Sequence, residues 1–304
     1  MVSSIFTYLG VIGVIIPLVI YMYYVYIEAW CFGYAVNFLT GGIHFGSVEE
    51  SGNFWAGFVG LEADGAALGW GWKKVGVPLL IVFLLNFWLI YRGLSKGIEL
   101  FCTYAMPTLI VLALIVLVRA LTLGTPDPTR PENNVSNGLG YMWNPNKWVV
   151  EQSRDLPGGS GSLWVVVEEL VGEQTIRARQ SEYAGRAGYR VREIRALDQL
   201  KNPQLWLAAA GQIFFSLSVG FGIVLTYASY LKKNDDVVLS SLSASSANEF
   251  CEVALGGLIT LPAAVAFLGI AGVAGKGTFG LGFNVLPMVF SEMPFGAFFG
   301  FAFF

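Results

Sequence analysis

Long runs of apolar residues constrain this chain more than any other feature of its sequence. Hydrophobic residues make up 55% of the 304 residues and charged residues only 13%, where a soluble domain carries roughly 25% charged residues. A helix needs about 20 mostly apolar residues to cross a bilayer. We therefore predict an all-α fold, a polytopic transmembrane helical bundle, with spans at residues 5–39, 75–91, 103–123, 205–231 and 247–271 and a sixth, truncated span at 295–304.

The segments between these spans differ in length and character. Two short basic turns, Tyr91–Gly97 and Leu231–Asp236, are separated by two spans, so the positive-inside rule assigns both to the cytoplasmic side. A polar loop is expected at 37–72. A longer polar segment at 124–202 contains a possible strand or interfacial helix at 161–172 and a possible amphipathic helix at 177–197 that is broken by Gly185 and Gly188. A solvated insertion and a partner-binding element are both open for this segment.

Several classes of site are disfavoured by composition. The chain has one histidine, His44, and its three cysteines, Cys31, Cys102 and Cys251, form no CxxC pair. A zinc site, a histidine-based catalytic site and a disulfide framework are therefore not expected. No nucleic-acid partner is expected either. Both ends of the chain look truncated, since no positive charge precedes the first span and the last apolar run stops at Phe304.

One apolar run contains residues that weaken a helix. The stretch GQIFFSLSVGFG, Gly211–Gly222, holds three glycines and two serines, and each helix-interior glycine costs about 1 kcal/mol relative to alanine. A helix that breaks here would expose carbonyls suited to a cation and N–H groups suited to an anion. Close packing of helices through small residues is the alternative explanation.

Polar residues in other spans are also candidates, because polar groups in the membrane are costly. Tyr24 shares a helical face with Ile20 and Ile27, and its hydroxyl would either serve a site or bond a neighbouring carbonyl. Glu28, one turn further, is expected near the outer interface. A second stripe consists of Ser241, Ser245, Asn248 and Glu252, beside Glu249, and either supplies oxygen ligands to a cation or lies in water at a cytoplasmic end.

Five motifs in order resemble the neurotransmitter:sodium symporters, specifically their prokaryotic amino-acid branch. They are YYVYIEAW at Tyr23–Trp30, SKGIE and AMPTL within Ser95–Leu109, GQIFFSLSVGFG with TYASY within Gly211–Tyr230, NE and EVALGG within Asn248–Gly257, and LPAAVAFLG at Leu261–Gly269. The resemblance covers nearly the whole chain except an insertion at about 147–196. It implies a partial inverted-repeat transporter fold with a discontinuous helix, from the third span to the start of the eighth, with extracellular loops at 37–72, 124–202 and 272–294.

The resemblance also implies roles for individual residues. The substrate-binding positions would be Ile20, Tyr24, Phe215, Ser216, Ser218 and Phe221, with Tyr24 binding the substrate carboxylate and Phe215 closing over the substrate. Ser216 and Asn248 would bind sodium, although Ser216 stands where the prokaryotic branch has threonine. Glu252 resembles the carboxylate that replaces chloride in chloride-independent members, with Gln212, Ser216 and Asn248 around it.

These expectations describe part of a sodium-coupled symporter that imports amino acids by alternating access, independently of chloride, as a multi-pass protein of the inner (plasma) membrane. Na⁺ is the coupling ion, the bilayer and an amino acid are the partners, and no organic cofactor or enzymatic activity is expected. A non-transporting or structural protein of the same fold, and a membrane-embedded enzyme using Glu249 and Glu252, are the alternatives. The amino acid, the sodium stoichiometry, a homodimer and the role of the insertion are left open.

Overall fold

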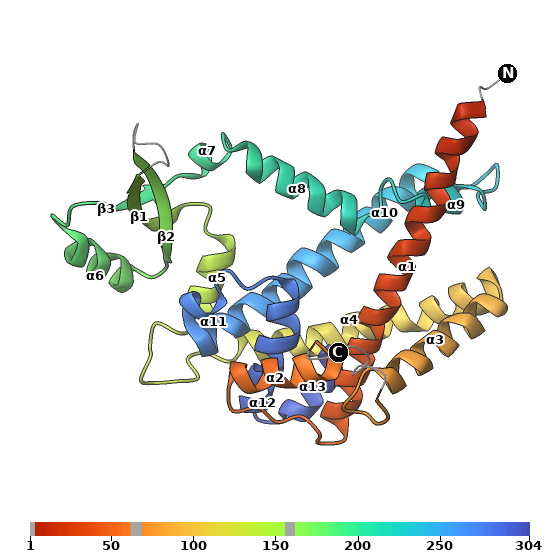
Figure 1. The fold of residues 1–304 in the computed structure, drawn as a ribbon, viewed down its shortest axis with the longest axis horizontal. Coiled ribbons are helices and arrows are strands. Elements are labelled where there is room, and N and C mark those ends of the chain that lie inside the picture. Colours follow the sequence, from red (N-terminus) through yellow and green to blue (C-terminus); the bar gives the residue numbers. More distant parts are fainter. Residues whose placement is uncertain (1–3, 62–68, 156–161) are drawn as a thin grey trace.

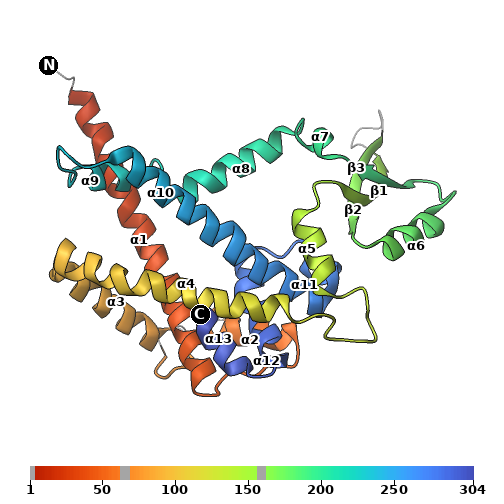
Figure 2. The same cartoon turned by 180° about the vertical axis from the view of Figure 1, so that it is seen from behind.

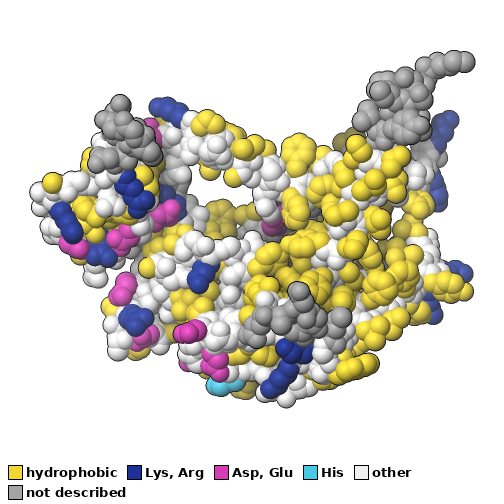
Figure 3. All heavy atoms as spheres, in the orientation of Figure 1, with side chains coloured by type: hydrophobic (Ala, Val, Ile, Leu, Met, Phe, Trp, Pro, Cys, Tyr) yellow, Lys and Arg dark blue, Asp and Glu magenta, His cyan; other side chains and the backbone are white. Residues whose placement is uncertain are grey.

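The computed structural model describes residues 4–61, 69–155 and 162–304. Parts of the expected loop at 37–72 and of the insertion at 147–196 therefore lie outside the described residues, as do residues 1–3. Helices dominate the described part, and a small sheet stands at one end of the molecule (Figures 1 and 2). Hydrophobic side chains gather over the helices, while charged side chains gather around the sheet and along the lower rim (Figure 3).

Long apolar helices occur where the hydropathy predicts them. The helices are α1 (Ser4–Leu39), α3 (Gly76–Tyr91), α4 (Leu100–Leu121) after the π-helix η2 (Leu94–Glu99), and α10 (Val237–Glu249), which continues through the π-helix η3 (Phe250–Gly257) into α11 (Leu258–Val273). Three stretches of the described residues are long and apolar enough to cross a membrane: Gly10–Leu39, Leu94–Leu121 and Val237–Val273. The last begins ten residues before the expected 247, because Asp236 caps α10 by accepting the Leu239 N–H at 2.9 Å.

The expected span at 205–231 is two helices rather than one. α8 (Pro203–Ser216) begins at Asn202, whose side chain accepts the N–H of Gln204 at 3.0 Å. It ends at Ser216, and α9 (Ile223–Ala228) begins after six intervening residues. The discontinuity expected from the glycines and serines is therefore present.

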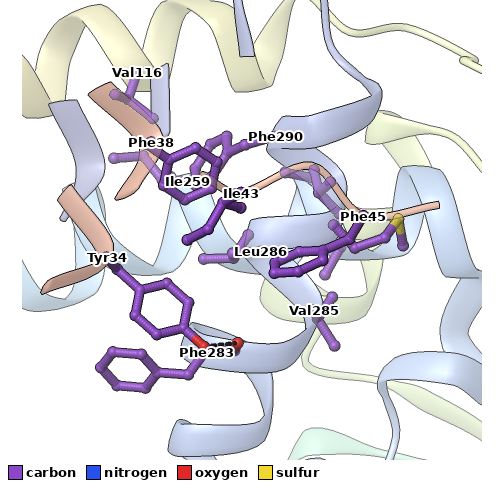
Figure 4. Packing of buried hydrophobic residues seen from close by; sticks show 14 of the residues in the cluster. Tyr34, Phe38, Ile43, Phe45, Val116, Ile259, Phe283, Val285, Leu286 and Phe290 are labelled. Atoms are coloured by element: carbon purple, nitrogen blue, oxygen red, sulfur yellow. Dashed lines mark hydrogen bonds between the residues drawn. The ribbon is translucent and has the colours of Figure 1, made fainter. Parts of the chain in front are cut away.

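The core lies where one end of α1 meets helices from later in the chain (Figure 4). Tyr34 and Phe38 of α1 are almost completely buried, and the Tyr34 hydroxyl donates to the carbonyl of Phe283 at 3.3 Å. The partners come from α2 (Val48–Val59), the π-helix η4 (Gly280–Val285), α12 (Leu286–Glu292) and α13 (Gly296–Phe303).

The segments 37–72 and 272–294, which were expected to be loops, thus contain helices. The apolar side chains of η4 and α12, including Val285, Leu286 and Phe290, are buried in the core, and burying them requires regular backbone that satisfies its own hydrogen bonds. The side of the membrane on which these segments lie stays a prediction.

The insertion forms a three-stranded antiparallel sheet, which the prediction of an all-α chain did not include. Its strands are β1 (Lys147–Asp155), β2 (Ser162–Leu170) and β3 (Tyr189–Ile194), in the order β2-β1-β3. Of the two structures that were open for 161–172, the described residues Ser162–Leu170 form the strand. The helix expected at 177–197 is broken at Gly185 and Gly188, as expected, since α6 (Glu173–Tyr183) ends before them and both have φ of +78°. Beyond the break the prediction of helix is wrong, because Tyr189–Ile194 forms β3.

A buried carboxylate fixes the pairing of β1 with β3. Glu151 has only 5% of its side chain exposed and accepts from Arg190 Nε at 2.6 Å and from Arg192 Nη2 at 2.9 Å. Burial opposes ionisation of Glu151, but the hydrogen bonds and charges of the two arginines outweigh it, so the pKa of this carboxyl is lowered.

The insertion leaves and rejoins the helices at adjacent points. α5 (Val135–Trp143) precedes it and α7 (Ala196–Gln199) follows it. The Asn146 side chain accepts the N–H of Ala196 at 3.1 Å, and Gln199 Nε2 donates to the carbonyl of Pro145 at 3.1 Å.

Candidate functional site

The backbone between α8 and α9 is unwound. Ser218, Gly220 and Gly222 all have positive φ, at +54°, +87° and +81°, and such values end an α-helix of L-residues. The ladder of helical backbone hydrogen bonds ends where the N–H of Val219 donates to the carbonyl of Phe214. It begins again where the N–H of Thr226 donates to the carbonyl of Gly222. Among the described residues, no backbone N–H donates to the carbonyls from Ser216 to Phe221, so these oxygens are free to act as ligands.

Gly222 brings the unwound segment against α1. A Cβ on Gly222 would lie 2.6 Å from the carbonyl oxygen of Gly13, so only glycine fits at this contact. The segment therefore needs glycine at position 222 for two reasons, its left-handed backbone and its close approach to α1.

Four polar side chains form one hydrogen-bonded cluster beside the break. Gln212 Nε2 donates to Glu252 Oε1, the Ser216 hydroxyl donates to Glu252 Oε2, and Asn248 Nδ2 donates to Ser216 Oγ. Gln212 and Ser216 come from α8, Asn248 from the last turn of α10 and Glu252 from η3. The i, i+4 spacings of the sequence thus bring Gln212, Ser216 and Asn248, the three residues expected around the carboxylate, together with Glu252 itself.

The cluster has the chemistry of a site for a hard monovalent cation. Its ligands are oxygens, and Glu252 forms no ion pair with a lysine, arginine or histidine among the described residues. An amide carbonyl of Asn248, the Ser216 hydroxyl and free carbonyls of the break are within the same region. No group of three or more His, Cys, Asp or Glu side chains able to hold a metal occurs in the described residues.

Aromatic side chains from α1 and α8 meet at the other side of the break. The ring of Tyr24 stacks on Phe215 with centroids 6.2 Å apart, and Phe215 meets Phe221 edge to face at 6.2 Å. Tyr24 and Phe215 are 39% and 48% exposed, so their faces are open to a ligand. The Tyr24 hydroxyl makes no hydrogen bond within the described structure, and its role at a site stays a prediction.

The remaining expected residues are less closely connected. Ile20 is half-buried on α1, one turn from Tyr24, and Ser218 lies in the break, where its N–H donates to Phe215 at 3.1 Å. Within the described residues, the Ser218 hydroxyl makes no hydrogen bond to the cluster, and the Ile20 side chain is apolar. Glu249 is also outside the cluster: its Oε1 is buried without a partner among the described residues, and no bond joins it to Glu252.

Two features near the site were not anticipated. Glu28 accepts from Asn86 Nδ2 of α3 at 2.7 Å, so it pairs with a neighbouring helix instead of standing free at an interface. The signal for this pair was Asn86 itself, an amide within an otherwise apolar helix. Glu252 lies in a π-helix, whose wider turn has no signature in this sequence.

Comparison with known proteins gives consistent matches. The model of the sodium:neurotransmitter symporter family matches residues 189–304. A sodium-dependent transporter of Haemophilus influenzae is 23% identical over 303 residues, covering 100% of this chain and 51% of that protein, and the Bacillus subtilis sodium-dependent transporter YhdH is 25% identical, covering 95% and 48%. The chain thus spans about half the length of these relatives.

The fold matches a solved transporter as well. The crystal structure of MhsT in complex with L-phenylalanine superposes with a TM-score of 0.63 at 24% identity, over 97% of this chain and 50% of that one. The human sodium- and chloride-dependent transporter XTRP3 is 25% identical over 80% of the chain. These relatives are named as transporters, and none of them as an enzyme.

Proposed function

Because residues 189–304 match the sodium:neurotransmitter symporter family and nearly the whole chain is similar to sodium-dependent transporters, we propose that it belongs to this family and carries part of a sodium-coupled symporter that imports amino acids by alternating access. The protein would span the plasma membrane several times. The observation that carries the proposal is the hydrogen-bonded cluster of Gln212, Ser216, Asn248 and Glu252 beside an unwound helix. Irregular backbone at membrane depth is tolerated where it lines a cavity or is buried in protein, and here it supplies ligands.

Sodium would bind at this cluster. The Ser216 hydroxyl, the Asn248 carbonyl oxygen and free carbonyls of the break provide neutral oxygens, and Glu252 provides the negative charge that balances the ion. Because α8 and α10 each contribute ligands, an ion bound between them would hold the two helices together. The sodium gradient would thereby favour the closed, loaded conformation.

The substrate would bind on the aromatic side of the break. The Tyr24 hydroxyl offers a hydrogen bond to a carboxylate, and the rings of Phe215 and Phe221 offer an apolar surface to a side chain. An amino acid with an apolar or aromatic side chain fits this combination. L-Phenylalanine, the compound bound in the MhsT structure, is the first substrate to test.

Glu252 would make transport independent of chloride. Its fixed charge stands beside Ser216 and Gln212 and does the work of a bound anion.

Sodium-dependent binding tests the ion site directly. The natural polypeptide that carries this sequence is purified in detergent, and binding of radiolabelled L-phenylalanine is measured at increasing sodium. We expect saturable, sodium-dependent binding that Asn248→Ala weakens at least tenfold, because the substitution removes an oxygen ligand. Ser241→Ala, on the same helix but away from the cluster, is the control and should bind as the wild type does. Equal binding with sodium and with choline would refute the proposal.

Chloride replacement tests the role of Glu252. In proteoliposomes, uptake by the wild-type protein should continue when gluconate replaces chloride, whereas Glu252→Ser should require added chloride. Glu249→Gln should leave the chloride response unchanged, because Glu249 is outside the cluster. Loss of wild-type uptake on removing chloride would contradict the assignment of Glu252.

A further inference from the structure

A second site candidate lies away from the broken helix, between the insertion and the end of α11. A cleft of about 1030 Å³ opens here. Its walls come from β2 and α6 on one side and from the last turns of α11 and the loop before α5 on the other. The apolar part of its lining includes Val166, Val167, Leu268, Ile270 and Ala271.

A bulge in β2 turns extra side chains toward the cleft. Val150 pairs with Glu168 and Glu151 with Val166, so Val167 has no partner on β1. Val166 and Val167 both line the cleft and are each 43% exposed, although successive residues of a regular strand point to opposite faces. Bulges re-aim side chains in this way and are frequent beside binding sites.

The opposite wall is a kinked helix with a buried amide against it. Gly269 interrupts α11 with φ +70° and ψ 173°. A Cβ there would lie 2.5 Å from Asn133 Oδ1, so glycine is needed for Asn133 to reach the backbone. Asn133 is only 6% exposed and lines the cleft, yet its side chain makes no hydrogen bond within the described part of the chain. Buried amides are normally hydrogen-bonded, so the Asn133 side chain has hydrogen-bonding capacity left for a ligand in the cleft.

The charges around the cleft favour a cation. Arg179 is already paired with Glu168 at 3.0 Å and with Glu182 at 2.5 Å. Two further lining carboxylates, Glu132 and Glu169, form no salt bridge within the described residues, although Glu169 lies close enough to Lys147 for their charges to interact. The remaining lining cation, Arg130, has a side chain that is 64% exposed and lies 3.9 Å from Asp127.

We propose that this cleft binds a small organic cation, with its ammonium group between Glu132 and Glu169, a hydrogen bond to the Asn133 carbonyl oxygen and its apolar body against Val166, Val167 and Leu268. The apolar wall distinguishes such a ligand from a metal ion, which would need oxygens on all sides. The site is separate from the proposed transport site and does not depend on sodium.

Calorimetry with three related compounds tests the proposal. The natural polypeptide is titrated in sodium-free buffer at pH 7.5 with 2-phenylethylamine, with neutral 3-phenylpropanol and with anionic 3-phenylpropionate. We expect the amine to bind most tightly. Glu169→Gln and Glu132→Gln should each weaken it about two- to fivefold, as expected for partly exposed ion pairs. Glu193→Gln, in β3 outside the cleft, is the matched control and should have no effect.

Two variants of the amide complete the test. Asn133→Asp keeps the shape and adds a negative charge, so it should strengthen amine binding, while Asn133→Ala should weaken it. Should Asn133→Ala fail to fold, the two glutamate variants still decide the outcome. The proposal is overturned if the amine shows no binding, if the alcohol or the carboxylate binds as tightly as the amine, or if the Glu132 and Glu169 variants bind it as well as Glu193→Gln does.

Discussion

Replacing Gly222 by alanine is the most direct test of the broken helix. Gly222 has φ +81°, and an alanine Cβ would lie 2.6 Å from the Gly13 carbonyl oxygen of α1. Left-handed backbone costs alanine about 1–2 kcal/mol, and overpacking adds about 1–3 kcal/mol. Gly222→Ala should therefore lower the free energy of unfolding by about 2–5 kcal/mol.

Two other glycines of the same segment separate these costs. Gly220 has φ +87°, but a Cβ added there would meet no atom within 4 Å, so Gly220→Ala isolates the backbone cost of about 1–2 kcal/mol. Gly211 lies inside α8 with ordinary φ and no neighbour within 4 Å. Gly211→Ala should stabilise the protein by about 0.5–1 kcal/mol.

Thermal unfolding of the natural polypeptide in detergent gives the ranking. The melting temperature should fall in the order Gly211→Ala, wild type, Gly220→Ala, Gly222→Ala, at about 2 °C per kcal/mol for a chain of this size. If Gly222→Ala and Gly220→Ala had the same melting temperature, the segment would not pack against Gly13. If Gly220→Ala had the melting temperature of the wild type, the left-handed backbone conformation at Gly220 would be refuted.

Two further predictions concern the insertion and its support. Glu151→Gln should destabilise the insertion by about 1–3 kcal/mol, because it removes a charge that two arginines share. Since the pKa of Glu151 is lowered on folding, its stabilisation is present above the unfolded pKa of about 4.3 and lost as the pH falls through the folded value. The free energy of unfolding in urea should therefore depend less on pH between pH 3 and 7 in the variant than in the wild type. The same pH dependence in both proteins would contradict this. Gly138→Ala should separate α5 from α11, because its Cβ would lie 2.6 Å from Pro262 Cα, and a loss of about 1–3 kcal/mol is expected. Gly277→Ala, where no atom lies within 4 Å, is its control in the same melting assay, and equal melting temperatures would refute the contact.

The sequence was most informative where backbone chemistry and helical spacing act locally. Three glycines and two serines in an apolar run predicted the break after Ser216, since positive φ and helix weakness are properties of the residues themselves. The spacing of Asn248 and Glu252 placed both on the face that meets α8, and the structure joins them through Ser216.

Features that depend on distant parts of the chain were harder to foresee. Residues 189–194 were expected to continue an amphipathic helix, yet they form a strand because β1 offers an edge on which Glu151 pairs with Arg190. Helices η4 and α12 were expected to be a loop. Their apolar residues adopt helical backbone because they pack on Tyr34 and Phe38, and this packing cannot be read from the local sequence. The pairing of Glu28 with Asn86 likewise requires knowing that α1 and α3 are neighbours.

The hydrogen bonds that tie Asn146 to Ala196 and Pro145 to Gln199 make the insertion a detachable module. Because the insertion leaves the helices and returns to them at adjacent points, its length and structure can change without moving the helices. The sheet can be lost, exchanged or enlarged in evolution without changing the path of the helices. Related chains can therefore share the helical frame and differ completely in this part.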